Sequence, residues 1–155
     1  MKNVKMLVMD VDGTLTDGKI YIGNSGEVFK AFDIKDGYAI HELLPAKGIV
    51  PVIITGRKSD IVKNRAKELE IKEVYQGYHD KKPVLLSVME RLDCTGENAA
   101  YIGDDILDLE CMSLCGVKGC PSDAASEIKD ICDYVCKQPG GHGAVREFIE
   151  WLIQD

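Results

Sequence analysis

The stretch Asp10-Val11-Asp12-Gly13-Thr14 constrains this chain more than any other part of its sequence. It follows an apolar run, residues 4–9, that predicts a buried strand. Side chains two positions apart on a strand point the same way, so both carboxylates would face one side. Two like charges in one place are costly unless a cation or a shared proton is present. Gly13 would let the backbone turn and present N–H groups, so the stretch predicts a site for a divalent cation and an anion.

The chain has the properties of one domain covering residues 1–155. A length of 155 residues is enough to bury a core, and the net charge of −7 argues against a nucleic-acid partner. No apolar run approaches the length of a membrane span, so no membrane association is expected. We recognise no signal peptide, and six cysteines without one suggest free thiols in a reducing compartment, which predicts a cytoplasmic protein.

Strand-like and helix-like patterns alternate along the chain. Strands are predicted at about residues 4–10, 20–22, 28–32, 49–54, 74–75, 99–102 and 134–135. Helices are predicted at about residues 36–48, 59–69, 80–92, 105–114, 123–130 and 144–153, with Pro45 expected to kink or shorten the first. This alternation predicts an α/β fold, a three-layer Rossmann-like sandwich with a mostly parallel sheet. A β-hairpin at residues 19–32 would project from it.

In open parallel sheets, ligands bind beyond the carboxyl ends of the strands. The residues that the predicted strands and the helix starts bring to that edge are Asp10, Asp12, Thr55, Arg57, Gly77, Lys81, Asp104, Asp105 and Asp108. The carboxylates suit Mg²⁺, and the hydroxyl, the lysine and backbone N–H groups suit a phosphoryl group. The edge is therefore predicted to be a phosphoryl-transfer centre.

Four of these segments together resemble the motifs of the haloacid dehalogenase superfamily of phosphohydrolases. They are Asp10-Val11-Asp12-Gly13-Thr14, Thr55, Lys81 and Gly103-Asp104-Asp105 with Asp108, and the match spans about residues 5–110. The resemblance implies that Asp10 is the nucleophile, which forms an aspartyl-phosphate. It also implies that Asp12 is the general acid for the leaving alcohol and then the base for water.

The resemblance implies further roles around that pair. Thr55 would bind the phosphoryl oxygens, and Lys81 would balance the negative charge of the nucleophile and the phosphoryl group. Gly13 and Gly56 would lie against the substrate. The cofactor would be Mg²⁺, held by Asp10, Asp104 and the backbone carbonyl of Asp12, with Asp105 and Asp108 behind these ligands.

The short gaps between the motifs leave no room for a cap domain. From Asp12 to Thr55 only a hairpin and one helix fit, and from Thr55 to Lys81 only a helix and a short strand. A site without a lid leaves the chemistry open to bulk water, which weakens its electrostatics. Either a macromolecular substrate or a neighbouring subunit is therefore expected to cover it.

Three more segments resemble the cap-less phosphatases of 3-deoxy keto sugar acids: Lys35-Asp36-Gly37, Thr55-Gly56-Arg57 and the glycine-rich tail at residues 140–147. This resemblance implies a homotetramer whose subunits cover each other's sites, and a small sugar-acid phosphate as substrate. The resemblance suggests that some relatives acting on nine-carbon keto acids carry Glu at this position, so Arg57 favours 3-deoxy-D-manno-octulosonate 8-phosphate, an intermediate of lipopolysaccharide biosynthesis. Its guanidinium could also bind a substrate carboxylate through two hydrogen bonds. Arg65 is a further candidate substrate contact, at a subunit boundary.

Three alternatives remain open at this point. The substrate could be a 9-phosphate of a sialic-type nine-carbon keto acid, or the enzyme could act on a macromolecule. A non-catalytic phosphoacceptor like the receiver domains of signalling proteins also combines strand-end acids, Thr and Lys. A receiver, however, carries its phosphoacceptor Asp at the end of a middle strand, and residues 55–57 contain no acid.

Overall fold

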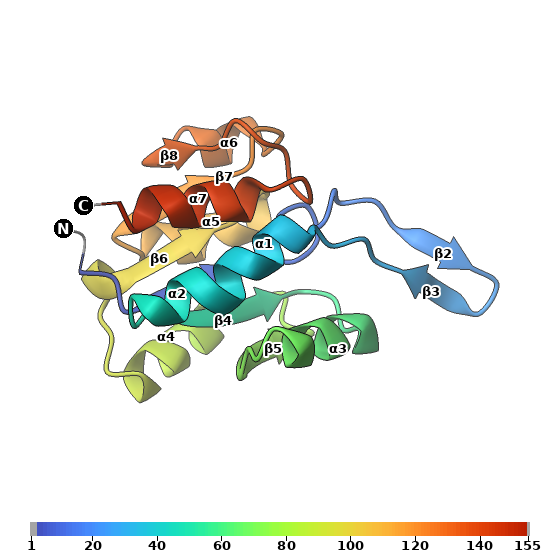
Figure 1. The fold of residues 1–155 in the computed structure, drawn as a ribbon, viewed down its shortest axis with the longest axis horizontal. Helices are drawn as coiled ribbons and strands as arrows, with labels where there is room; N and C mark the ends of the chain where they lie inside the picture. Colours follow the sequence, from blue (N-terminus) through green and yellow to red (C-terminus); the bar gives the residue numbers. More distant parts are fainter. Residues whose placement is uncertain (1–2, 155) are drawn as a thin grey trace.

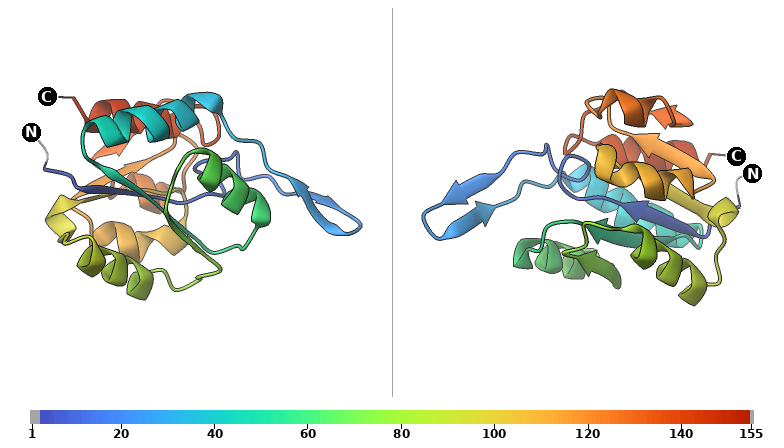
Figure 2. Two further views of the ribbon diagram at one scale, coloured as in Figure 1. Left: turned by 60° about the horizontal axis from the view of Figure 1, so that its bottom comes forward. Right: turned by 180° about the vertical axis from the view of Figure 1, so that it is seen from behind.

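A six-stranded sheet forms the centre of the computed structural model, which describes residues 3–154. The strand order is β5-β4-β1-β6-β7-β8, and every neighbouring pair is parallel. The strands are β1 (Met6–Met9), β4 (Val50–Thr55), β5 (Glu73–Gln76), β6 (Ala99–Ile102), β7 (Val117–Cys120) and β8 (Tyr134–Val135). Helices cover both faces (Figures 1 and 2), which confirms the predicted α/β sandwich.

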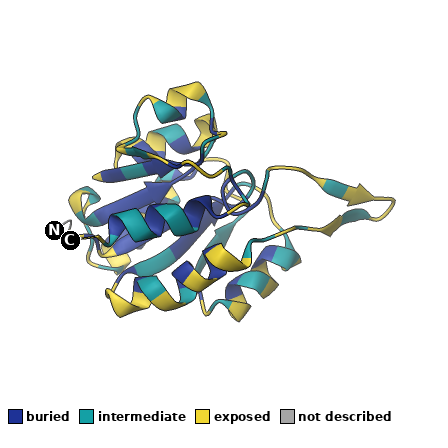
Figure 3. Cartoon of the chain, turned by 45° about the horizontal axis from the view of Figure 1, so that its top comes forward, coloured by how far each residue is buried: buried dark blue, intermediate teal, exposed yellow. Residues whose placement is uncertain are grey.

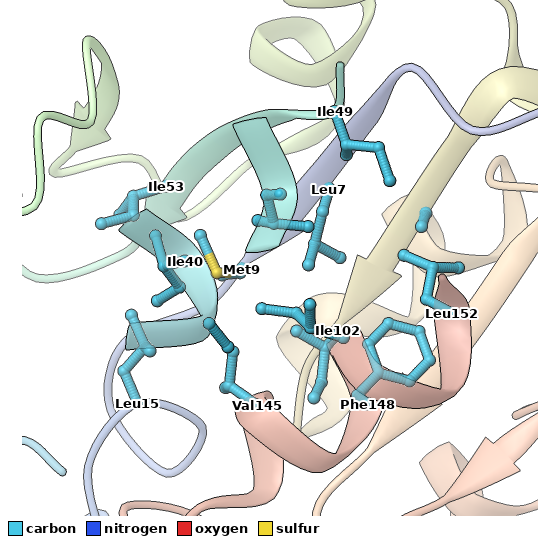
Figure 4. Close-up of a cluster of buried hydrophobic side chains, with 14 of the residues drawn as sticks. Leu7, Met9, Leu15, Ile40, Ile49, Ile53, Ile102, Val145, Phe148 and Leu152 are labelled. Atoms are coloured by element: carbon cyan, nitrogen blue, oxygen red, sulfur yellow. The ribbon is translucent and has the colours of Figure 1, made fainter. Parts of the chain in front are cut away.

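The residues of β1 alternate between two hydrophobic clusters, one on each face of the sheet. Leu7 and Met9 pack with residues of the helices at 34–46 and 144–152, as Figure 4 shows. Met6 and Val8 pack with residues of the helices at 82–91 and 106–113. Because both faces of β1 are covered, all four of its residues are buried and apolar, as a central parallel strand requires (Figure 3).

The helices form two layers around that sheet. On the face of Leu7 lie α1 (Ile34–Tyr38), a π-helical turn (Ala39–Leu43), α2 (Leu44–Ala46), α3 (Asp60–Glu68) and α7 (Ala144–Leu152). On the face of Met6 lie α4 (Lys82–Arg91), α5 (Ile106–Ser113) and α6 (Ser126–Lys129), and a 3-10 turn (Gly96–Asn98) precedes β6. None of the helices in this described part is long and apolar enough to span a bilayer.

The predicted hairpin is confirmed and projects well beyond the sheet (Figure 1). It consists of β2 (Tyr21–Gly23) and β3 (Gly26–Phe29), which pair antiparallel. Its large apolar side chains are mostly outside the core: Ile22 is 72% exposed and Val28 is 61% exposed. A two-stranded hairpin of this kind has little packing of its own and exposes hydrophobic surface.

The structure differs from the predicted local structure at β7 and at α6. The strand β7 was not predicted, because Lys118 and Gly119 interrupt its apolar pattern. Gly119 is required there because the Phe148 ring of α7 occupies the space that a Cβ would need, with Cε2 only 2.3 Å away. The helix expected at residues 123–130 is only the four-residue α6.

Pro45, which was expected to kink or shorten its helix, is accommodated because the π-helical turn before it shifts the hydrogen bonding, and the helix ends at Ala46. The N–H of Leu44 bonds to the carbonyl of Ala39, five residues back, and Pro45 enters the first turn of α2. A proline is tolerated in a first turn because its missing N–H has no partner to lose there.

Candidate active site

The carboxyl ends of β1, β4 and β6 meet at a hollow of about 300 Å³. This edge of the sheet is where the sequence predicted the site. The hollow is lined by Asp10, Asp12, Gly18, Thr55, Gly56, Arg57, His79, Lys81, Asp104, Asp105, Leu107 and Asp108. Polar groups from four connections of the sheet therefore converge on one space.

Within the hollow, Asp10, Asp104 and Asp108 form a cluster that we call the carboxylate floor. One oxygen of each lies within 4.8 Å of the others. Lys81, whose side chain is only 2% exposed, donates to Asp10 Oδ1 at 3.0 Å and to Asp108 Oδ1 at 2.8 Å. Tyr101 on β6 donates to the same oxygen of Asp108 at 2.8 Å.

Burial and mutual repulsion make it unfavourable to ionise the carboxyl groups of the floor. Burial, with the charge of Asp108, raises the pKa of Asp10 to about 6. Burial, with the charges of Asp10 and Asp108, raises the pKa of Asp104 to about 8. Burial opposes the charge of Lys81, but the carboxylates of Asp10 and Asp108 outweigh it and raise the lysine pKa. The floor holds more negative charge than Lys81 neutralises, so it favours a bound cation.

The oxygens of the floor fit a hard divalent cation, and they are not equally available to it. Asp108 already has partners on both oxygens: Oδ1 accepts from Lys81 and Tyr101, and Oδ2 accepts from the N–H of Asp104 at 3.1 Å. Asp104 is less engaged in hydrogen bonds: its Oδ1 accepts one from Thr14 Oγ1 at 3.1 Å. Asp10 and Asp104 are therefore the side chains best able to hold a metal.

The loop after Asp10 is wound tightly against Asp104. The carbonyl of Val11 accepts three successive N–H groups, those of residues 14–16, at 2.9 to 3.1 Å. Gly13 has φ +89°, and a Cβ there would collide with Asp104 Oδ2, so any other residue would strain the backbone and displace the Asp104 carboxylate. Gly141 of the tail donates to the carbonyl of Thr14 at 3.2 Å. The glycine-rich tail thus packs on the loop of its own chain.

A second charged group surrounds Asp12 at the entrance, and we call Asp12, Glu27, Lys30 and Arg57 the rim. Lys30 Nζ lies 2.6 Å from Asp12 Oδ1 and 3.0 Å from Glu27 Oε2. Arg57, which is half exposed, has its Nε 4.0 Å from Asp12 Oδ2 and an Nη 3.6 Å from Glu27. Lys30 lowers the pKa of Glu27, although burial opposes this. The rim charges balance each other within the chain.

Most of the residues proposed for the site line the hollow, but Gly13, Gly77 and Arg65 do not. Arg65 lies on α3, where it pairs with Glu68 at 2.9 Å and sits 5.7 Å from the ring of Phe32. It lines a separate small cavity between α1 and α3. Sequence reasoning missed Lys30 and Glu27, and the available signal was a lysine within the apolar pattern of residues 28–32.

Comparisons with known proteins show which enzymes this chain resembles. Residues 71–149 match the family of haloacid dehalogenase-like hydrolases. The chain is 41% identical over 152 residues to the 3-deoxy-D-manno-octulosonate 8-phosphate phosphatase KdsC of Escherichia coli K12, a match that covers 98% of this chain and 80% of that protein.

Two solved structures resemble it closely. The cobalt-bound deoxy-D-mannose-octulosonate 8-phosphate phosphatase YrbI of Haemophilus influenzae has a TM-score of 0.94 and 35% identity, covering 99% of this chain and 89% of that one. The 3-deoxy-D-manno-octulosonate 8-phosphate phosphatase of Moraxella catarrhalis, in complex with magnesium, phosphate and KDO, has a TM-score of 0.93 and 38% identity. That match covers 98% of this chain and 87% of the other. Divalent metals are thus bound in structures similar to this one.

Proposed function

The chain belongs to the haloacid dehalogenase-like hydrolases and is a phosphoric monoester hydrolase, and we propose that it hydrolyses 3-deoxy-D-manno-octulosonate 8-phosphate. The observation that carries the proposed substrate is the extent of the similarity to the E. coli enzyme. It covers 98% of this chain and therefore includes the hairpin and the glycine-rich tail as well as the floor. Family membership also removes the receiver-like alternative, since a receiver is not a hydrolase.

In the proposed reaction, Asp10 attacks phosphorus and a P–O bond to its carboxylate forms while the bond to the leaving alcohol breaks. Asp12 donates a proton to the departing oxygen. In the second half, Asp12 takes a proton from water, and the water oxygen displaces Asp10 from phosphorus. Asp10 is poised for this role because Lys81 holds its Oδ1 at 3.0 Å and thereby sets its orientation.

The remaining residues would stabilise charge on the phosphoryl group. Lys81 would balance part of the negative charge, and Thr55, buried at the end of β4, would donate its hydroxyl to a phosphoryl oxygen. Mg²⁺, held by Asp10, Asp104 and the backbone carbonyl of Asp12, would supply further positive charge beside the phosphoryl oxygens. The raised pKa values of Asp10 and Asp104 support this assignment, because a cation relieves the repulsion that contributes to them.

Two features support a small substrate covered by neighbouring subunits in a homotetramer. Only β2, β3 and the helical segment at residues 34–46 lie between Asp12 and the start of β4, so the chain has no cap domain there. The hairpin carries exposed apolar side chains, Ile22, Val28 and Phe29, that contact with another copy would bury. Arg57 is exposed at the entrance, where it could bind the carboxylate of a keto acid.

A phosphate-release screen with Mg²⁺ tests the substrate. It should include 3-deoxy-D-manno-octulosonate 8-phosphate, 9-phosphates of nine-carbon keto acids, common sugar phosphates and a phosphopeptide. We expect the highest kcat/KM with the 8-phosphate, and a preference for the nine-carbon compounds would support the sialic-type alternative. No turnover of any keto-acid phosphate would overturn the proposed substrate.

Sedimentation of the wild type and of Val28→Asp tests the assembly. We expect a tetramer for the wild type and smaller species for the variant, because a charge replaces an apolar side chain in the contact. Lys19→Asp, an equally drastic change at an exposed position outside the two strands, is the control. A monomeric wild type would instead favour a macromolecular substrate.

A further inference from the structure

Lys30 has a buried side chain to which the mechanism above assigns no role. Its side chain is only 2% exposed, although it follows β3 in a projecting hairpin whose other large side chains are mostly exposed. Burying an ammonium group is costly unless the charge is paired and hydrogen-bonded. Lys30 meets this condition through Asp12 Oδ1 at 2.6 Å and Glu27 Oε2 at 3.0 Å.

The contacts of Glu27 connect this lysine to the body of the protein. Glu27 Oε1 accepts from Ser59 Oγ at 3.0 Å, and Ser59 is the N-cap of α3. The base of the hairpin is thereby tied to the connection that follows β4. Because Glu27 is held in place, it in turn holds the amine of Lys30 beside Asp12.

The contact with Lys30 distinguishes the two oxygens of Asp12. Oδ1 accepts a short, charge-assisted hydrogen bond from Lys30. Arg57 Nε lies 4.0 Å from Oδ2, beyond hydrogen-bond distance. Lys30 therefore restricts the rotation of the carboxyl group and leaves Oδ2 free for another partner.

We propose that Lys30 is a positioning residue, which holds Asp12 so that Oδ2 carries the proton given to the leaving oxygen. The inference rests on the proposed role of Asp12 as general acid. As the P–O bond to the alcohol breaks, its electron pair stays on the alcohol oxygen, and the proton on Oδ2 moves to that oxygen. Asp12 becomes a carboxylate, and Lys30 keeps it in place for the later removal of a proton from water.

The consequence is that the hairpin sets the geometry of the acid. Lys30, from a segment outside the sheet, orients the general acid Asp12, whereas Lys81 orients the nucleophile Asp10 from within the core. Loss of Lys30 should impair protonation of the leaving group and spare nucleophilic attack.

Leaving-group dependence of kcat/KM tests this inference, because kcat/KM reports the steps up to transfer of phosphorus to Asp10. The substrates are p-nitrophenyl phosphate, whose leaving group departs without a proton, and whichever alkyl phosphomonoester the wild type hydrolyses best. For Lys30→Met we expect a loss of about 100-fold with the alkyl ester, within the range that general acids contribute. The loss with the aryl ester should be below about fivefold. Lys30→Arg, which keeps the charge, should recover most of the alkyl activity.

The matched control is Lys19→Met, the same substitution at an exposed position near the hairpin. It should leave both kcat/KM values unchanged. Melting temperatures check that each variant folds, and Lys30→Gln replaces Lys30→Met if the latter does not.

Equal losses with both substrates, or no loss with either, would overturn the inference, since a purely structural lysine cannot distinguish leaving groups. The result is separable from that of the substrate screen. A wild type that rejects the keto-acid phosphate can still be tested with another alkyl ester.

Discussion

The floor and the rim are two groups of charges that meet at neighbouring aspartates, Asp10 and Asp12, yet they are stabilised in opposite ways. The floor carries three carboxylates against one lysine and is built from the ends of the sheet and from helices packed on it. The rim carries two carboxylates against Lys30 and Arg57, and half of it comes from the hairpin segment. The floor needs a cation from outside, whereas the rim supplies its own.

This difference suits the two proposed roles of Asp10 and Asp12, which are nucleophile and general acid. Asp10 is buried, and burial raises its pKa to about 6 because the ionised carboxylate is poorly solvated there. A metal that relieves this cost would also place positive charge where a phosphoryl group would bind. Asp12 has to exchange a proton with the substrate and with water, so a partly open position with a fixed partner suits it better.

The largest expected effect comes from Asp10→Asn. We expect kcat to fall at least about 1,000-fold, because an amide oxygen is a poor nucleophile. The melting temperature of the metal-free protein should not fall, since the change removes one of the repelling charges and keeps an acceptor for Lys81. The control is Asp130→Asn, an exposed position. An active Asp10→Asn enzyme would exclude Asp10 as the nucleophile.

Lys81→Met should break the floor itself. The substitution leaves buried carboxylates without their partner, and breaking a buried pair in this way costs about 3 to 5 kcal/mol of unfolding free energy. Urea denaturation of the metal-free protein measures it. Lys82→Met is the matched control, because Lys82 is partly exposed and its ion pair with Glu110 lies at the surface. Similar stabilities of the two variants would contradict our description of the floor.

Asp36 provides a buried carboxylate outside both groups. Burial raises its pKa to about 6, against the hydrogen bond from the N–H of Arg146, while Asp33 and Arg65 act with opposite signs. Since the folded chain then binds the proton more tightly than the unfolded chain, this group stabilises the fold below about pH 4. We expect up to about 3 kcal/mol to be lost as pH rises from about 4 to 6.

The measurement is the difference in unfolding free energy between wild type and Asp36→Asn across that pH range. Mg²⁺ should not alter this difference, because Asp36 lies beneath α7 and does not line the hollow. A difference that is constant with pH would contradict the raised pKa of Asp36.

The smallest effect is that of the metal on stability. At a Mg²⁺ concentration of 100 times its Kd, the unfolding free energy should rise by about 2.7 kcal/mol. Asp104→Asn should abolish most of this gain, and Lys30→Met should retain it, because Lys30 belongs to the rim. Equal responses of the two variants would mean that the floor and the rim are not separate, and thermal unfolding with and without Mg²⁺ decides this.

Much of this organisation could be predicted from local patterns. The buried strand before Asp10, the acids after β1 and β6 and the projecting hairpin each depend on residues close together in the chain. Such patterns report periodicity and turn chemistry directly. The expected edge of the sheet then brings Asp10, Thr55 and Asp104 together without further information.

What the sequence by itself determined was therefore the type of fold and the acidic edge of its sheet. Only the tertiary structure decided which charges are buried and which partner each one has. Nothing in the sequence links Lys30 to Asp12 until the hairpin brings them together, and nothing in it shows that Lys81 and Tyr101 both donate to Asp108 Oδ1. Gly119 likewise reads as a strand breaker until Phe148 fills its place. Burial and pairing depend on what packs over a residue, and that neighbour is usually distant in sequence.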